Sequence, residues 1–415
     1  MSFEMRLRVP RLAAGVGLAT WLLVGAGDPP TATPEIQWDR GDATALLEAI
    51  DDARLEGLDP ADYDAAGVRR AIASGDAKQL AAVSTRVGLK LAGDLLQGHV
   101  RGRARVGWHI AGPVASEPAL AALLARAAAG NRVGAALAEL LPQHAEYRAL
   151  RNALVATPPS DAARVRSLRV NLERWRWMPR ELGSRHILVN VPGFALKLVD
   201  RDRIVDERAV IVGKPTTPTP QFGGTVTGVV LSPWWEVPKS IVNESIGNLV
   251  LRQPARAKAQ GYVMTRLDGG GIRVRQAPGP QNALGQMKLV MPNPFNVYLH
   301  DTPAKARFDE SMRTFSHGCI RVKGAVDFAA LLLESDPDWD RARIDRVLQS
   351  RRTTTATLGK PLPVWIGYFT VATAADGHLT FFADPYNRDA PVWKALTDGP
   401  PLQLSARARP DQCPA

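Results

Sequence analysis

Residues 186–212, HILVNVPGFALKLVDRDRIVDERAVIV, decide the fold class of the larger part of this chain. They contain three short runs rich in aliphatic and β-branched residues, separated by Pro192-Gly193 and Asp200-Arg201-Asp202. Short β-rich runs between turn-forming residues are typical of strands that follow one another as hairpins. This segment therefore predicts a sheet with strands at 186–191, 195–199 and 204–212.

The same pattern returns later in the chain and is interrupted once. Further β-rich runs lie at 225–231, 297–299, 364–373 and 379–383. Residues 241–292, rich in Gly, Gln, Arg and Pro, show no clear periodicity. A stretch of about fifty such residues within a compact domain is typical of an irregular subdomain or lid. We expect an insert that covers a substrate; a surface excursion without a role is the alternative.

Residues 44–151 show a helical pattern instead. Apolar residues there recur three or four positions apart, the spacing that lines one face of a helix, and the clearest set is Leu80, Val83, Val87, Leu91 and Leu95. Residues 156–160, ATPPS, read as a linker, and a short helix at 168–177 leads into the strands.

The predicted fold class is therefore α+β, with two domains in sequence. An all-α domain occupies 35–155, and a mainly antiparallel, β-sandwich-like domain with a few helices and the insert at 241–292 occupies 165–395. We expect one of these helices at 325–333.

Composition and charge limit the classes of function. The chain has 415 residues, 45% of them hydrophobic and 22% charged, which suits a globular protein with a real core. The formal net charge is +11, but the arginines are scattered, which indicates solvated helix faces. A basic face for a polyanion such as cell wall or an anionic membrane is the alternative. Nucleic acid is not an expected partner, because no motif of a known reader module accompanies the charge.

The two ends of the chain read as segments outside the folded domains. Arg6, Arg8 and Arg11 precede an uncharged run that ends in small residues at 24–27, the pattern of a secretory signal. We expect residues 1–30 to direct export to the periplasm, either as a cleaved signal peptide or as an anchor in the inner membrane. Residues 400–415 are expected to be a disordered tail.

The chemistry of this chain is concentrated around Cys319. A free cysteine has a pKa of about 8.5 and is only a few per cent ionised at neutral pH, so a nucleophilic thiol needs a base beside it. His300 and His317 are the candidates. Tyr298 and His300 share a face of their strand. If the loop 301–315 returns the chain beside that strand, His300 reaches the sulfur, and a backbone carbonyl such as that of Asp301 can orient its ring.

The neighbours of Cys319 suit acyl chemistry. Gly318 lets the backbone approach a bound carbonyl, and the N–H groups of Gly318 and Cys319 are natural oxyanion donors. His317 could bind substrate, support the oxyanion, or make a buried structural hydrogen bond. The guanidinium of Arg321 can form a bidentate pair with a substrate carboxylate. A surface salt bridge is the alternative role.

Cys319 has two alternative roles, in a disulfide or in a metal site. In an exported protein a disulfide between Cys319 and Cys413 is conceivable. A metal site from His300, His317 and Cys319 is disfavoured, because no fourth ligand or CxxC pair is near. We expect neither a metal nor a cofactor. A papain-like peptidase fits poorly, because its cysteine precedes its histidine in the chain.

A histidine, a spacer and then Ser-His-Gly-Cys with an aliphatic residue and Arg resembles the motif of the YkuD-type L,D-transpeptidases of bacterial cell walls. The wider chain resembles the YcbB-like subgroup at 55–63, 171–177, 233–238 and 298–303. These segments correspond to the helical scaffold domain, the start of the catalytic domain, its first sheet and the histidine strand. The peptidoglycan-binding lobe usual in that subgroup is missing here.

The resemblance implies an enzyme that forms 3,3-crosslinks in peptidoglycan. Cys319 would attack a tetrapeptide stem after its third residue, usually diaminopimelate, and form a thioester as D-alanine leaves. An amine of a second stem would then take the acyl group, with His300 as the base in both steps. The resemblance also implies that carbapenems acylate Cys319. We expect the substrate to contact Tyr298, Ser316, Arg321 and Trp234.

The expected partners are donor and acceptor stem peptides, together with cell-wall synthesis proteins, and the protein itself is expected to be a monomer. Two alternatives stay open. An L,D-carboxypeptidase would resolve the same thioester with water and trim tetrapeptide stems. A non-catalytic wall-binding scaffold protein would not use the thiol at all.

Overall fold

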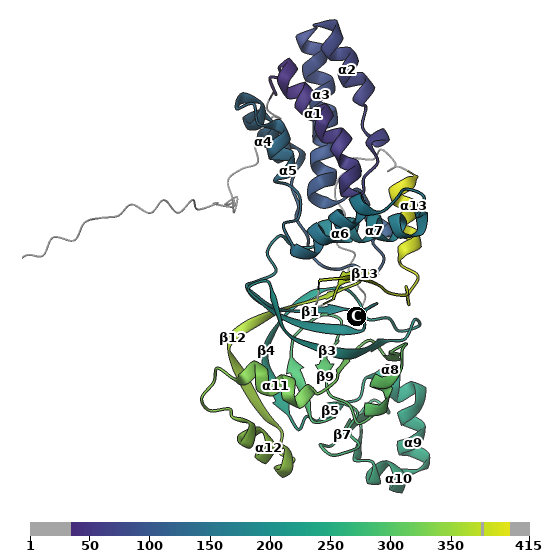
Figure 1. The fold of residues 1–415 in the computed structure, drawn as a ribbon. Helices are drawn as coiled ribbons and strands as arrows, with labels where there is room; N and C mark the ends of the chain where they lie inside the picture. The colour runs from purple at the N-terminus through teal and green to yellow at the C-terminus, as the bar shows by residue number, and fades with distance from the viewer. Residues whose placement is uncertain (1–34, 375–376, 399–415) are drawn as a thin grey trace, which may run out of the picture.

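The computed structural model describes residues 35–374 and 377–398. The predicted signal segment and the predicted tail lie outside these residues. Figure 1 shows a helical part at one end and a β part below it, in the order that the sequence predicts. No helix among the described residues is long and apolar enough to cross a membrane.

The helical part is built from α1 (Arg40–Asp52), α2 (Ala65–Ser74), α3 (Ala77–Gln97), α4 (Glu117–Ala129) and α5 (Val133–Ala138). Side-chain oxygens of Asp39, Asp76 and Ser116 accept backbone N–H groups at the first turns of α1, α3 and α4, so these helices begin where a cap is present. The predicted apolar set lies along α3, where Leu80, Val87, Leu91 and Leu95 are buried and Val83 is half-buried. The helical prediction is confirmed.

Three helices form the junction between the two parts: α6 (Ala145–Ala156), α7 (Ala162–Arg176) and α13 (Asp389–Thr397) (Figure 1). Arg176 and Glu173 of α7 form a fully buried ion pair of 2.6 Å. Arg176 also donates to the carbonyl oxygen of Glu56, and the N–H of Val100 donates to Glu173. These bonds tie the helical domain to the start of the β domain.

The β part is one mixed sheet that closes on itself. Its strand order is β10-β3-β11-β9-β8-β4-β12-β1-β2, and β2 also pairs with β3. Most pairings are antiparallel, but β1 with β12, β9 with β11 and β10 with β3 are parallel. The strands are β1 (Arg185–Asn190), β2 (Ala195–Asp200), β3 (Arg203–Gly213), β4 (Gly223–Leu231), β8 (Met287–Val290), β9 (Leu299–His300), β10 (Thr314–Ser316), β11 (Ile320–Val322) and β12 (Thr354–Gly367).

The core of this domain lies between the sheet and α11 (Ala325–Leu333), with α12 (Arg341–Ser350) beside it. Phe328 and Ala329 of α11 are fully buried against aliphatic residues of the strands. The predicted strand at 364–373 is in fact the end of β12 and a separate β13 (Val371–Thr373), which pairs with β14 (Leu379–Phe381).

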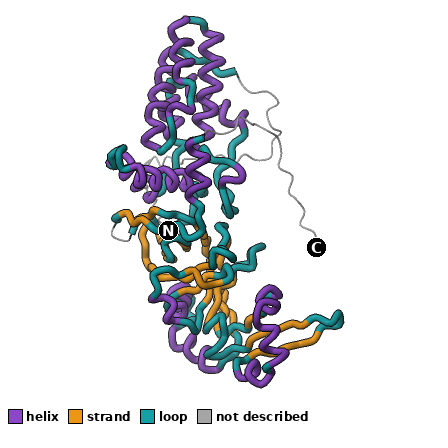
Figure 2. Tube along the Cα trace, turned by 90° about the vertical axis from the view of Figure 1, so that its right-hand side faces the viewer, coloured by secondary structure: helices purple, strands orange, loops and turns teal. Residues whose placement is uncertain are grey.

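The predicted insert is a small subdomain, which we call the cap and define as residues 235–286. It contains α8 (Lys239–Ile241), a π-helical turn (Val242–Ile246), α9 (Gly247–Arg252), α10 (Pro254–Ala259), and the three-stranded sheet of β5 (Trp235–Glu236), β7 (Ile272–Gln276) and β6 (Tyr262–Arg266). Val242, Val250 and Val274 belong to its own core. The cap therefore begins and ends earlier than the predicted insert at 241–292, because β5 precedes residue 241 and β8 belongs to the main sheet. Figure 2 shows this subdomain at the end of the molecule farthest from the helical domain.

Candidate active site

The pairing of β9 with β11 brings the two halves of the Cys319 motif together. Ile320 lies opposite Leu299 and Arg321 lies opposite His300 in a parallel register, and the N–H of Ile320 donates to the carbonyl oxygen of Tyr298 at 2.8 Å. Leu299 and Ile320 are fully buried in the core. Because side chains alternate along a strand, Tyr298, His300, Cys319 and Arg321 lie together on the other face.

A further residue joins this face from β8. Lys288 lies opposite His300 in the antiparallel pairing of β8 with β9. Its Nζ atom is 4.8 Å from the centroid of the Tyr298 ring. Sequence reasoning missed Lys288. The alternation of Met287, Lys288 and Leu289 places the lysine opposite to the core face, but only the strand register reveals what lies next to it.

His300 is held as a neutral imidazole, with the backbone carbonyl groups of Asp301 and Leu284 beside its ring. Its side chain is buried, and Nδ1 donates to the carbonyl oxygen of Asp301 at 2.5 Å. A carbonyl oxygen can only accept, so the proton sits on Nδ1 and the lone pair on Nε2. Burial, together with the charge of Arg321, lowers the pKa of His300 to about 4. At neutral pH the ring can accept a proton but carries no charge.

Cys319 is a half-buried thiol in the resting molecule. Burial raises its pKa, while the backbone N–H of Tyr298 and the charges of Arg321 and Lys288 act in the opposite direction. The sulfur lies 3.8 Å from the carbonyl oxygen of Asn296, which suits a weak S–H donor. The site therefore combines a protonated thiol and a neutral base, so the proton must move during the reaction.

The turn before Cys319 is fixed by two hydroxyl groups. Gly318 has a φ of 111°, a conformation that favours glycine. Ser316 donates to the carbonyl oxygen of Cys319 at 2.5 Å and accepts the N–H of Gly318 at 3.1 Å. Thr219 donates to the carbonyl oxygen of Gly318 at 2.8 Å. These bonds hold the backbone of Gly318 and Cys319 in one geometry.

The hydrogen bonds of this turn contradict two predictions from the sequence, the substrate contact of Ser316 and the oxyanion role of the Gly318 N–H. Ser316 is buried, and its hydroxyl is engaged with the backbone, so it positions the turn instead of contacting a substrate. The N–H of Gly318 already donates to Ser316 and cannot also serve an oxyanion. The N–H of Cys319 donates none of the hydrogen bonds found among the described residues, and it is the oxyanion donor that remains.

His317 and Arg321 have different surroundings from each other. His317 is exposed, and its Nε2 lies 2.9 Å from Glu244 Oε2 in the π-helical turn of the cap, so the alternative of a buried structural bond is wrong. Arg321 is mostly enclosed, and burial lowers its pKa. Its Nε has no hydrogen-bond partner, and no carboxylate within the described residues forms an ion pair with it. The alternative of a surface salt bridge is therefore not found.

Trp234 makes none of the contacts described above for the Cys319 cluster. It precedes β5 at the start of the cap, is 38% exposed, and stacks on the guanidinium of Arg275 at 5.0 Å.

No group of three or more His, Cys, Asp or Glu side chains that could hold a metal occurs within the described ranges. The alternative of a disulfide involves Cys413, which lies outside them.

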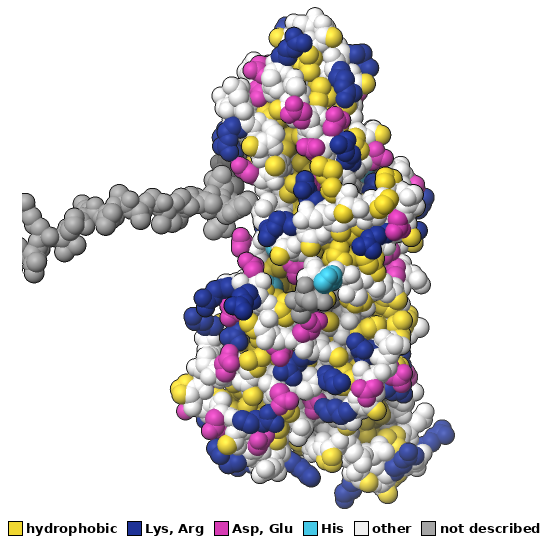
Figure 3. Space-filling view, viewed as in Figure 1, with side chains coloured by type: hydrophobic (Ala, Val, Ile, Leu, Met, Phe, Trp, Pro, Cys, Tyr) yellow, Lys and Arg dark blue, Asp and Glu magenta, His cyan; other side chains and the backbone are white. Residues whose placement is uncertain are grey.

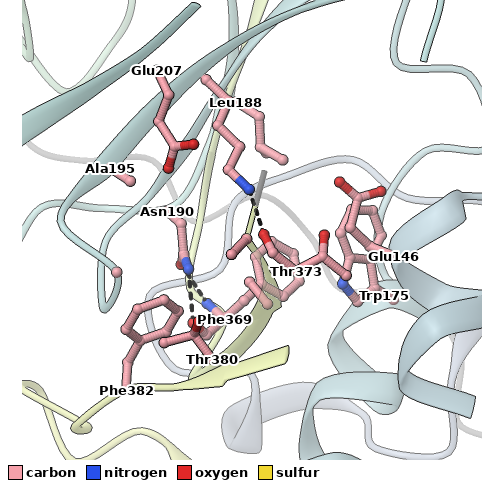
Figure 4. A pocket seen from close by; sticks show the side chains of 14 residues that line it. Glu146, Trp175, Leu188, Asn190, Ala195, Glu207, Phe369, Thr373, Thr380 and Phe382 are labelled. Atoms are coloured by element: carbon pink, nitrogen blue, oxygen red, sulfur yellow. Dashed lines mark hydrogen bonds between the residues drawn. The ribbon is translucent and has the colours of Figure 1, made fainter. Parts of the chain in front are cut away.

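A separate cavity lies at the junction with the helical domain. Its volume is about 190 Å³, and Trp175, Asn190, Lys197 and Phe369 are among its lining residues (Figure 4). Lys197 donates to the carbonyl oxygen of Thr373, and Asn190 donates to that of Phe369. None of its lining residues belongs to the Cys319 cluster, so this cavity is not part of the candidate active site.

Two family models match this chain. Residues 184–344 match the L,D-transpeptidase catalytic domain (YkuD), and residues 36–154 match the Scaffold domain. A putative L,D-transpeptidase of Haemophilus influenzae is 30% identical over 241 residues, which are 54% of this chain and 48% of that protein. The chain thus matches about half the length of this relative.

Solved structures of L,D-transpeptidases are also similar to part of the chain. An L,D-transpeptidase from Mycobacterium smegmatis is 11% identical, with a TM-score of 0.23 over 44% of this chain and 58% of that one. The catalytic domain of an Enterococcus faecium L,D-transpeptidase acylated by ertapenem is 14% identical, with a TM-score of 0.21 over 45% of this chain and 99% of that one.

Proposed function

We propose, from the match of residues 184–344 to the YkuD model of L,D-transpeptidase catalytic domains, that this protein forms 3,3-crosslinks between peptidoglycan stem peptides through a thioester on Cys319. The single observation that supports this most is the parallel pairing of β9 with β11. It sets His300, whose Nδ1 is held by the carbonyl oxygen of Asp301, on the same face as the thiol.

The first half of the proposed reaction is acylation of Cys319. As the sulfur attacks the carbonyl carbon of the third stem residue, its proton passes to Nε2 of His300. The tetrahedral oxygen is stabilised by the N–H of Cys319. The imidazolium, whose pKa burial lowers, then gives the proton to the leaving amine of D-alanine. A thioester and free D-alanine result.

The second half returns the enzyme to its starting state. A side-chain amine from a second stem attacks the thioester, and His300 takes one of its protons. The C–S bond breaks, the thiolate leaves and is reprotonated, and an amide joins the two stems. In this scheme Arg321 pairs with a donor carboxylate and Tyr298 lines the site, while the cap covers the bound stem.

Water in place of the amine would give a carboxypeptidase, and product masses separate the two. Purified full-length protein is incubated with a disaccharide-tetrapeptide, and Cys319→Ala is the control. Dimers that have lost one D-alanine, absent with the variant, support crosslinking. If tripeptide monomers are the only product, the enzyme is a carboxypeptidase and the crosslinking proposal is wrong. No change in mass would favour a non-catalytic wall-binding role.

The setting of this activity is proposed from the sequence. We infer an exported, periplasmic enzyme that acts as a monomer with other wall-synthesis proteins. The two family matches leave only residues 155–183 between them, and α7 lies there, so the chain has no room for a wall-binding lobe at this place. Figure 3 shows basic and acidic side chains interspersed over one face of the molecule.

A further inference from the structure

Lys288 is a charged residue of the Cys319 face that the scheme above does not use. It comes from β8, on the far side of β9 from Cys319. Its ammonium lies over the ring of Tyr298, 4.8 Å from the centroid. Tyr298 directly precedes β9, and the register of β9 with β11 places it beside Cys319. Arg321, on β11, lies on the other side of His300. His300 is thus flanked by one cation on each side, and both cations act electrostatically on Cys319.

The ammonium of Lys288 has no carboxylate partner of its own. The lysine is half-buried, and no ion pair joins it to an acid within the described residues. Glu236 of the cap acts on it electrostatically, but that carboxylate already pairs with Arg273 at 3.0 Å and lies 3.9 Å from Arg275. A half-buried ammonium without a counter-ion is costly, and an anion formed beside it offsets that cost.

His300 does not supply this charge balance in the resting enzyme, because its ring is neutral at neutral pH. In many cysteine enzymes a neighbouring imidazolium stabilises the thiolate. Here the groups that can act on the sulfur before its proton reaches His300 are those that already carry a charge. Those facing it are Arg321 on its own strand and Lys288 on β8, with Tyr298 and Glu236 as the remaining titratable neighbours.

We propose that the ammonium of Lys288 stabilises the thiolate of Cys319 electrostatically as the thiol proton moves to Nε2 of His300. Arg321 is then able to pair with a substrate carboxylate while Lys288 supports the sulfur. This inference rests on the nucleophile assigned in the proposed function.

The test is the pH dependence of Cys319 alkylation in the full chain. Iodoacetamide labelling is followed from pH 5 to 11, with the label located on Cys319 by peptide mass spectrometry. Lys288→Met should move the midpoint upward by about one pH unit and slow labelling at pH 7 about tenfold. Lys288→Arg should stay within about threefold of the unchanged protein. Lys323→Met, which removes an exposed lysine, should behave as the unchanged protein does.

A Lys288→Met protein that titrates like the unchanged one overturns the proposal, and a raised KM for the donor stem alone would make Lys288 a substrate-binding residue instead. Should Lys288→Met fail to fold, Lys288→Gln serves the same comparison. Alkylation of Cys319 needs no stem peptide, so the effect of Lys288 on the thiol can be measured even if the protein forms no crosslinks. The role of Lys288 and the crosslinking activity are therefore tested separately.

Discussion

Arg321 lies directly opposite His300 in the parallel pairing of β11 with β9, and its charge helps to hold the histidine neutral. The same register places Cys319 on the face that His300 serves. One strand pairing therefore sets the protonation state of the base and the position of the nucleophile together.

Removing the charge of Arg321 should shift the acid limit of the reaction. The pKa of His300 is about 4 partly because of this neighbour, so Arg321→Gln should raise it and move the loss of acylation to higher pH. We expect a shift of about one pH unit in the rate of acylation by meropenem, followed by intact-protein mass, with Arg321→Lys closer to the unchanged protein. An acid limit that stays in place would contradict the coupling between these residues.

The buried neutral His300 should also make stability depend on pH. In the unfolded chain its pKa is about 6.5, so between about pH 6.5 and 4 the unfolded state binds more protons and stability falls as the pH falls. Urea unfolding should show a loss of about 2 kcal/mol from pH 7.5 to pH 5 that His300→Gln lacks. Equal pH slopes for the two proteins would rule this out.

Ser316 should act on the geometry of the turn and not on substrate affinity. Ser316→Ala removes two hydrogen bonds to the backbone of Gly318 and Cys319, which should cost about 1–3 kcal/mol of unfolding free energy and slow acylation of Cys319. Ser311→Ala, at an exposed serine, is the matched control. A large rise in KM at unchanged stability would restore the sequence-based expectation that Ser316 binds the stem.

The ion pair at the junction should be far more sensitive than one at the surface. Burial alone would raise the pKa of Glu173, but Arg176, the N–H of Val100 and the charge of Arg105 together lower it. Glu173→Ala leaves a buried guanidinium uncompensated and should cost about 3–5 kcal/mol in urea unfolding. Glu139→Ala breaks the exposed pair with Arg132 and should cost less than about 1 kcal/mol. Similar losses in the two variants would speak against this reading of the junction.

Local pattern was enough to predict much of this fold. The apolar spacing along α3, the hairpin strands from 186 to 212 and the helix at 325–333 all rest on neighbours close in sequence, and the structure confirms them. The carbonyl of Asp301 as the partner of His300 also follows from adjacency in the chain.

Long-range register was what the sequence could not provide. Lys288 is separated from His300 by a loop whose length does not fix which residues face each other, so its place in the site appears only once β8 and β9 are paired. The first half of β12 was missed because Gly359, Lys360 and two prolines interrupt its β pattern. The engagement of Ser316 depends on the backbone of a single turn, which the motif alone does not reveal.

Intact-protein mass after exposure to meropenem tests the central claim most directly. The account predicts one covalent adduct, located on Cys319, absent in Cys319→Ala and formed at least about a hundredfold more slowly in His300→Gln. A protein that forms no adduct, or a His300→Gln variant that reacts as fast as the unchanged chain, would contradict a thiol activated by this histidine.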